Sequence, residues 1–448
     1  MQKVIWLFLL NLIVFGTSGA ADLENSWSLQ KCIDIAIENN LQIKKLKLDS
    51  LGAHLSYRAA KSALYPSVSG GISYSFSPQI KPDTNLYIRG FDTLRQTGDR
   101  IRQSARYSVS GRWTVFDGLG LQTDVKIKEL GIQKTGSSIK TSQVDLMLAV
   151  TNAYLQILYS KEGLQNAIAS RDASKVQRDR AEALLSTGSA SKVELARMEA
   201  SLATDEYNVI VAKNNYLQKE RDLKKLLQIP LDSVIILNFP DLGDSVALPE
   251  IPSIETIYTA ALKTMPEIET SQINVELAAL AIKRARSSYY PSLSVSGGIS
   301  TGNSNGTGSF TEQLVDNTNL SIGADLSIPI YDNNKKKTSL ENAKIEEKRA
   351  ELSLKDAQIQ LYEDVQSAYY DAEASKSKFE AAKLQLDRAR QSYEIAQEQF
   401  KLGMINPTEL LVEKNAYLSA TTDLLQSKFS AVLSRQLINV LMGKPISL

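Results

Sequence analysis

The chain has very few of the residues that most catalytic and metal sites require. Its 448 residues include one cysteine, Cys32, and one histidine, His54. A single cysteine excludes an intramolecular disulfide, and one cysteine with one histidine leaves no zinc cluster and no Cys–His nucleophile pair. The glycine pairs Gly70-Gly71 and Gly297-Gly298 lie in strand-like sequence, which excludes them as phosphate-binding loops. We therefore expect no enzyme, no metal and no cofactor.

The chain also lacks an excess of charge of one sign and a long apolar helix. Its 51 basic and 50 acidic residues nearly cancel, which argues against nucleic acid as a partner. One apolar run, residues 4–15, follows Lys3 and leads into small residues ending at Ala20 and Ala21. This pattern predicts a secretory signal peptide at residues 1–21. The alternative is a membrane anchor, for which the run is short.

Two parts of the chain follow the same plan. Residues 65–73 read YPSVSGGIS and residues 290–300 read YPSLSVSGGIS, so both end in SVSGGIS. Gly188 corresponds in the same way to Gly403. Such self-similarity indicates two copies of one structural unit.

The duplication predicts a first repeat at 22–229, a linker or equatorial segment at 230–252 and a second repeat at 253–448. Each repeat is expected to contain a helix, a β-hairpin and a long helical hairpin. A polar loop is expected to join the two strands of each hairpin, and it is longer in the first repeat. These three elements are predicted at 27–63, 67–116 and 118–229 in the first repeat, and at 253–288, 291–330 and 332–442 in the second.

Four segments of about ten residues alternate between polar and apolar side chains, with the period of two that is typical of β-strands. About ten residues is the length that a tilted strand needs to cross a bilayer. Aromatic residues lie toward the ends of the apolar face, as in outer-membrane barrels. The polar face is mostly serine and carries Arg112 and Asp325, our candidates for a wet lumen. The four segments are 68–76, 107–115, 293–299 and 320–330.

Four strands are too few to close a barrel. In lipid, an open sheet edge would leave backbone N–H and C=O groups without partners, so spanning strands have to be shared between chains. Three chains would contribute twelve strands, an even number within the range of outer-membrane barrels. The alternative is a pair of soluble hairpins packed on helices.

The long helical stretches show a heptad pattern with many small residues. Residues 332–403 would extend roughly 100 Å as one helix, several times the apolar thickness of a bilayer, and the polar flanks place them in water. An exported structural coiled-coil protein would explain these hairpins but not the four alternating segments. The clearest seam consists of Leu361, Val365, Ala368, Ala372, Ser375, Phe379, Ala382, Leu386, Ala389, Tyr393, Ala396, Phe400 and Gly403.

The tips of the two helical hairpins match each other position by position. Gly188 and Gly403 follow a helix end, where a left-handed backbone favours glycine. Ser191 and Asn406 are predicted to be the N-caps of the returning helices.

Glu194 and Glu409 follow these N-caps by three residues. This spacing predicts capping boxes. In a symmetric assembly, a ring of Glu409 side chains at the tip would also favour cations. Both hypotheses stay open at this point.

With this plan the chain resembles the TolC-like outer-membrane efflux proteins, and the resemblance covers nearly all of the expected mature chain. Its carriers are the duplication, the Tyr-Pro-Ser motifs at 65–67 and 290–292, Phe116-Asp117-Gly118 and the two tips. The resemblance implies an α+β membrane protein. Four transmembrane β-strands per chain would join a trimeric twelve-stranded β-barrel in the outer membrane, and long α-helical coiled-coil hairpins would form a periplasmic tunnel.

The resemblance also implies a function without chemistry. The homotrimer would be a passive exit duct of a tripartite efflux or type I secretion system, docked to a periplasmic adaptor and an inner-membrane transporter. Drugs, metals, peptides and secreted proteins are the candidate cargoes.

The same resemblance assigns roles to residues near the tips. Gly188 with Ser189, and Gly403 with Met404, would be the adaptor-docking turns. Phe400, Glu409 and Glu194 would lie at the periplasmic gate or constriction. Ile405 and Val412 depart from the pattern of the best-known family member, which has a basic gate residue at the place of Ile405 and an acidic one at the place of Val412.

Overall fold

The computed structural model describes residues 26–78, 84–89, 92–97, 101–238, 250–305 and 308–446. The predicted signal peptide and part of the predicted linker lie outside these ranges. The chain forms two compact units, and each takes segments from both repeats. The hairpin unit consists of Met1–Lys44, Thr141–Met265 and Gln360–Leu448, and the strand unit of Lys45–Lys140 and Pro266–Ile359.

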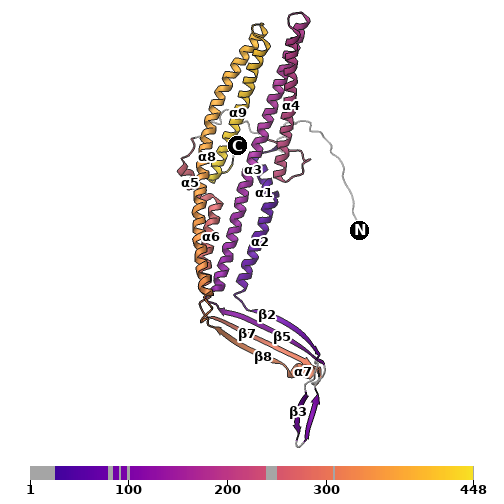
Figure 1. The fold of residues 1–448 in the computed structure, drawn as a ribbon, viewed down its shortest axis with the longest axis vertical. Coiled ribbons are helices and arrows are strands. Elements are labelled where there is room, and N and C mark those ends of the chain that lie inside the picture. The colour runs from indigo at the N-terminus through magenta and orange to yellow at the C-terminus, as the bar shows by residue number, and fades with distance from the viewer. Residues whose placement is uncertain are drawn as a thin grey trace, which may run out of the picture. The chain divides into compact units, whose positions relative to one another are not determined.

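The strand unit contains one four-stranded antiparallel sheet with the order β2-β5-β7-β8 (Figure 1). The strand pairs of the two repeats meet where β5 pairs with β7. Strands β2 and β8 form the two edges and have one neighbour each within the described residues. The strands are β2 (Ser67–Pro78), β5 (Ile101–Phe116), β7 (Ser292–Ser304) and β8 (Asn319–Ser327).

The register of the sheet aligns the predicted alternation across all four strands. Arg112 lies opposite Ser67 on one side and Ser296 on the other, whereas Ile72 lies opposite Tyr107. Because directly opposite residues share a face, one face is polar throughout and the other is apolar. The fourth predicted strand was too long, since β8 ends before Ile328 and Ile330.

The segments that join β2 to β5 and β7 to β8 contain short strands or a helix, where polar loops were expected. In the first repeat, β3 (Thr84–Arg89) pairs antiparallel with β4 (Asp92–Thr97). In the second, the helix α7 (Phe310–Asp316) begins at a capping box between Ser309 and Glu312. These elements are too short to produce a clear periodic signal in sequence.

The first helix of each repeat is interrupted, so the prediction of one continuous helix was wrong. In the first repeat the side chain of Asn40 accepts a hydrogen bond of 2.9 Å from the N–H of Ile43, which starts a new helix. In the second repeat Pro266 has no N–H and restricts Met265 to extended backbone. The resulting helices are α1 (Leu29–Asn39), α2 (Leu41–Ser62), α5 (Ile254–Thr264) and α6 (Pro266–Ser287).

The junctions from strand to long helix use an aspartate cap. Asp117 accepts a hydrogen bond of 3.0 Å from the backbone N–H four residues further on, and Asp332 does the same. Gly118 lies beside the first of these caps at a φ of +71°, and a Cβ there would lie 2.4 Å from the carbonyl oxygen of Ser287. Only glycine fits this close approach between the strand exit and α6.

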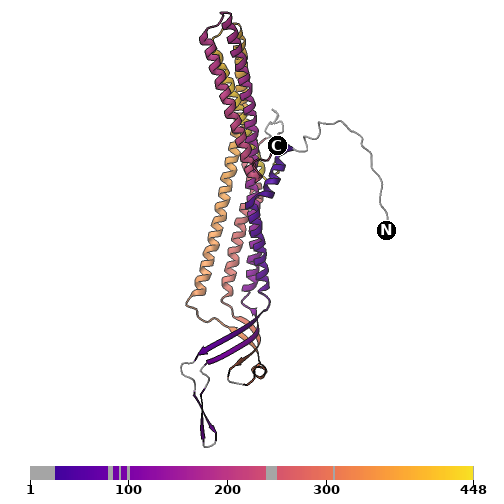
Figure 2. The same cartoon turned by 90° about the vertical axis from the view of Figure 1, so that its right-hand side faces the viewer.

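The long helices are α3 (Gly120–Ser186), α4 (Lys192–Leu227), α8 (Lys335–Lys401) and α9 (Pro407–Leu441). In the hairpin unit α4 returns along α3 and α9 along α8 (Figure 1 and Figure 2). All eight buried residues of α8 belong to the predicted heptad seam. Among the described helices, none has both the length and the apolar character needed to span a membrane.

The largest core cluster of the hairpin unit joins α1 to α3 and α4. Cys32 and Ile33 pack here with Val150, Tyr154 and Leu223. Burial raises the pKa of the Cys32 thiol to about 12, so almost none of it is thiolate near neutral pH. Cys32 is therefore a packing residue with low reactivity.

A buried ion pair also joins the two helical hairpins of this unit. Lys414 on α9 forms an ion pair with Asp205 on α4 and a hydrogen bond of 2.5 Å with Ser174 on α3. Ser174 in turn donates a 2.6 Å bond to the Asp205 carboxylate. Lys414 and Asp205 are 3% and 6% exposed. Two charges this deeply buried are tolerated only as a pair.

We predict that Asp205→Leu destabilises the hairpin unit, by about 3–5 kcal/mol, because it leaves the Lys414 ammonium buried without a counter-charge. The double variant Asp205→Leu/Lys414→Met should recover most of this loss, since no charge is then left unpaired. Thermal unfolding followed by circular dichroism at 222 nm measures both effects. Arg390→Gln, which breaks an exposed pair with Glu394, is the control; an equal loss in Asp205→Leu and Arg390→Gln would contradict the prediction.

Candidate functional site

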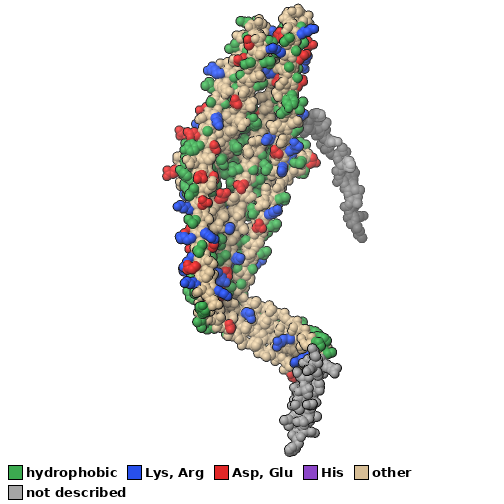
Figure 3. Space-filling view, viewed as in Figure 1, with side chains coloured by type: hydrophobic (Ala, Val, Ile, Leu, Met, Phe, Trp, Pro, Cys, Tyr) green, Lys and Arg blue, Asp and Glu red, His purple; other side chains and the backbone are tan. Residues whose placement is uncertain are grey.

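The polar face of the sheet carries both predicted lumen residues. Arg112 and Asp325 are exposed and share this face, because Arg112 pairs with Ser296 and Asp325 with Ser294. The neighbouring positions are mainly serine and glycine. The sheet face turned to the viewer in Figure 3 is mostly tan with blue Lys and Arg side chains.

Two further arginines, Arg102 and Arg106, lie on the same polar face. Arg102 pairs with Ser77 and Arg106 with Ser73. Both arginines lie outside the second predicted strand, whose alternation begins at Tyr107, whereas β5 begins at Ile101. Extending the same parity by three steps toward the N-terminus would have found both.

The opposite face of the sheet is apolar and, within the described residues, largely exposed. Its residues are 75% exposed at Val68, 79% at Ile72 and 81% at Ile322. Soluble hairpins packed on helices would bury such side chains. A contiguous exposed apolar face of this kind instead marks a surface that meets lipid or protein.

Both hairpin tips adopt the same backbone motif. Gly188 has a φ of +74° and Gly403 a φ of +72°. The N–H groups of Ser189 and Met404 bond carbonyl oxygens five residues back, at 2.8 Å in both cases. This is the Schellman motif, in which glycine ends a helix in the left-handed region. All four tip residues are exposed and free to meet a partner.

The returning helices begin at the predicted N-caps. Ser191 accepts a bond from the N–H of Glu194, and Asn406 from that of Glu409, both at 3.1 Å. Within the described residues, however, neither glutamate bonds the backbone N–H of its cap, so the predicted capping boxes are incomplete. The Glu409 carboxylate instead accepts a 2.9 Å bond from the side-chain amide of Asn406, a donor that serine lacks.

The predicted gate residues differ in their surroundings. Phe400 is half-buried and packs on a cluster of Tyr393, Ala396 and Leu410. Ile405, which departs from the pattern of the best-known family member, packs on the same cluster and is therefore part of the apolar core of the tip. Glu409 is exposed and Glu194 is half-buried.

Two arginines join the tips of the two hairpins. Arg180 donates a 2.7 Å hydrogen bond to the carbonyl of Lys401, and Arg197 donates to the hydroxyl of Thr408. Thr408 precedes Glu409, so the two predicted constriction segments are held together. Sequence reasoning did not find these contacts, because the partners lie more than two hundred residues apart.

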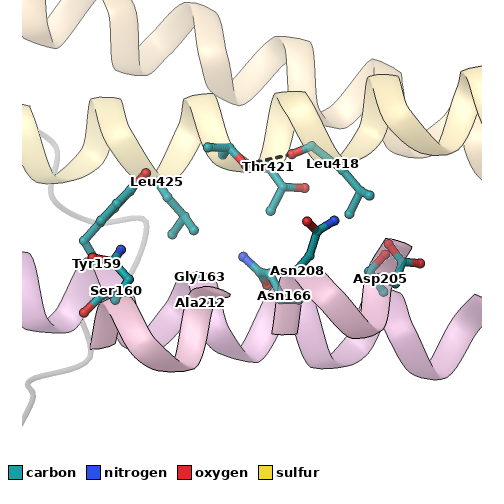
Figure 4. Close-up of a pocket in the computed structure, with 14 residues that line it drawn as sticks. Tyr159, Ser160, Gly163, Asn166, Asp205, Asn208, Ala212, Leu418, Thr421 and Leu425 are labelled. Atoms are coloured by element: carbon teal, nitrogen blue, oxygen red, sulfur yellow. Dashed lines mark hydrogen bonds between the residues drawn. The ribbon is translucent and has the colours of Figure 1, made fainter. Parts of the chain in front are cut away.

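A cavity of about 260 Å³ with a mixed polar and apolar lining lies beside the buried ion pair, between α3, α4 and α9 (Figure 4). Asn166 and Asn208 point into it in Figure 4, and Asp205 lies at one end. The hydroxyl of Ser170, on its wall, is buried without a partner among the described residues. The polar side chains of this cavity could hold water. No group of acidic, histidine or cysteine residues within the described ranges is arranged to hold a metal.

Comparisons with known proteins agree with this architecture. The family described as "Outer membrane efflux protein" matches residues 32–227 and 257–444. TolC of Salmonella enteritidis is 20% identical over 324 residues, which cover 71% of this chain and 62% of that TolC. This chain thus matches less than two thirds of the length of that relative.

Solved structures share the fold. CusC gives a TM-score of 0.78 at 16% identity, with 93% of this chain and 92% of CusC covered. VceC of Vibrio cholerae gives 0.74 at 14% identity, with 94% and 97% covered. These likenesses support the predicted combination of long helices and a β-portion.

The family match confirms the predicted resemblance, because it covers most of both repeats. The matched family is one of outer-membrane efflux proteins, which agrees with the expected outer-membrane location and with the expectation that the protein is no enzyme. The chain belongs to the outer membrane efflux protein family.

Proposed function

We propose that three copies of this chain form a passive exit duct, which works with a periplasmic adaptor and an inner-membrane transporter in tripartite efflux or type I secretion. The observation that carries the proposal is the four-stranded sheet, which has one polar face, one uncovered apolar face and two open edges. Family membership supports the efflux role.

The open edges require other copies. Strands β2 and β8 have neighbours on one side only within the described residues. In lipid each unpaired backbone group costs several kcal/mol. If β2 of one chain pairs with β8 of the next, three chains close a twelve-stranded barrel, whose apolar face meets lipid and whose polar face encloses water.

The tips supply the docking surface of the duct. Gly188, Ser189, Gly403 and Met404 are exposed at the ends of the helical hairpins, on two turns with the same backbone motif. Periplasmic adaptors would dock there. Phe400, Glu409 and Glu194 would form the constriction, and the contacts from Arg180 and Arg197 would hold the two tips together in its closed state.

The energy for transport has to come from the partner transporter. The described residues contain no metal cluster, and the sequence has no phosphate-binding loop. An exported coiled-coil protein without channel activity would share the hairpins, but it would have no use for an uncovered apolar sheet face.

Orientation of the sheet is tested by a matched pair of substitutions on β8. We expect Ile322→Arg to reduce the trimer recovered from the outer membrane, because a cation on the lipid face near the midplane costs about 2–4 kcal/mol. Ser321→Arg lies on the polar face of the same strand and should leave the yield close to that of the wild type. Unheated electrophoresis of outer-membrane extracts measures the trimer, and planar-bilayer conductance measures the channel.

Two results would contradict the proposal of an exit duct. One is equal trimer yield in Ile322→Arg and Ser321→Arg, which would mean that neither face meets lipid. The other is recovery of the wild-type chain as a soluble monomer without conductance, which would favour the coiled-coil alternative.

Docking at the tips is tested by photo-crosslinking in cells. A photoreactive amino acid at Ser189 or Met404 avoids the strained glycine positions and should give an adduct with the mass of this chain plus one adaptor. Leu384, which is exposed on α8 and lies 17 residues before the end of that helix, is the control and should give little adduct. Adducts of equal strength at all three positions would argue against specific docking at the tips.

A further inference from the structure

The charged residues of the four-stranded sheet are strongly unbalanced. Strands β2, β5, β7 and β8 contain three arginines and one aspartate. All four lie on the polar face, where Arg102, Arg106 and Arg112 are exposed. The formal side-chain charges on the polar face of one chain therefore sum to +2.

The arginines have no partner of opposite charge on this face. None of the three forms an ion pair with a described residue. The residues directly opposite Arg106 are Ser73 and Gly302. Asp325 lies on β8, two strands away from the arginines on β5, so it is roughly 10 Å away across the sheet. The positive charges of the three arginines are thus available to attract solutes.

The arginines are spread along β5 from one end to the other. At about 3.4 Å per residue, Arg102 and Arg106 lie roughly 14 Å apart, and Arg106 and Arg112 roughly 20 Å. Each would form a ring of three in a trimer. The rings would extend through most of the lumen instead of marking one constriction, and low-dielectric walls would strengthen their field.

We propose that Arg102, Arg106 and Arg112 make the lumen of the barrel positively charged, so that it concentrates anionic solutes and favours anionic cargo over cationic cargo. This inference rests on the proposed duct. The sign is opposite to that of the Glu409 carboxylates at the tips.

The proposal is tested with a thiol reporter on the polar face. Ser73→Cys places a thiol opposite Arg106 without removing an arginine. The natural Cys32 is buried and its pKa is raised to about 12, so it contributes no background labelling. Sulfonatoethyl methanethiosulfonate is the anionic probe and trimethylammonioethyl methanethiosulfonate the cationic one. Both are added to outer-membrane vesicles and reach the barrel from outside, without passing the tips.

We expect the anionic probe to modify Ser73→Cys about tenfold faster than the cationic probe at low salt, after each rate is divided by its rate with a free thiol. The ratio of the anionic to the cationic rate should fall in Ser73→Cys/Arg106→Gln. It should come closer still to one when Arg102→Gln and Arg112→Gln are added. It should also fall at 1 M salt, where the Debye length is about 3 Å instead of about 30 Å at 0.01 M.

The controls separate this inference from the duct on which it rests. Ser73→Cys/Arg388→Gln removes an exposed arginine on α8 and should leave the ratio unchanged. Unheated electrophoresis checks that every variant still forms trimers. A Ser73→Cys that reacts, but reacts as fast with the cationic probe or keeps its ratio without the arginines, overturns the inference and leaves the duct intact. A Ser73→Cys that neither probe reaches, while Ile72→Cys is modified, overturns the lumen itself and the inference with it.

Discussion

The architecture depends on the backbone groups at the two open edges of the sheet. Strands β2 and β8 each pair on one side within the described residues, so a single chain cannot satisfy its own hydrogen bonds in lipid. In water, the exposed apolar face of the sheet would be unfavourable. In lipid, the unpaired edges of an isolated chain would be unfavourable. In the proposed trimer, pairing with other copies would satisfy the strand edges and lipid would cover the apolar face. Folding of one chain would then depend on assembly.

The hairpin unit has a different constraint, because its long helices are polar outside the buried seams. Its heptad seam is rich in small residues, which lets helices approach closely but buries little apolar area per residue. The buried contact of Lys414 with Asp205 and Ser174 adds specificity to this pairing, since the three groups are satisfied only when α3, α4 and α9 are in register. A contact of this kind fixes one arrangement more than it adds stability.

Local patterns in the sequence predicted the parts of the structure that have a repeating period or a local cap. The alternation around Ile72, the seam from Leu361 onward and the N-cap at Asn406 all depend on residues close in sequence. The helix break at Asn40 depends on a competing local bond that many sequences could make. The pair of Lys414 and Asp205 is 209 residues apart, and no periodicity reports a contact at that distance.

The two hairpin tips share one backbone motif, whereas the two outer connections differ, one containing β3 and β4 and the other α7. A protein that recognises the backbone of the tips therefore finds two similar turns on each chain. One type of binding groove could fit both turns. Within the described residues, the connections between the strands show no such doubling. A chain can thus offer two equivalent binding positions at its hairpin tips but only one of each kind at its strand connections.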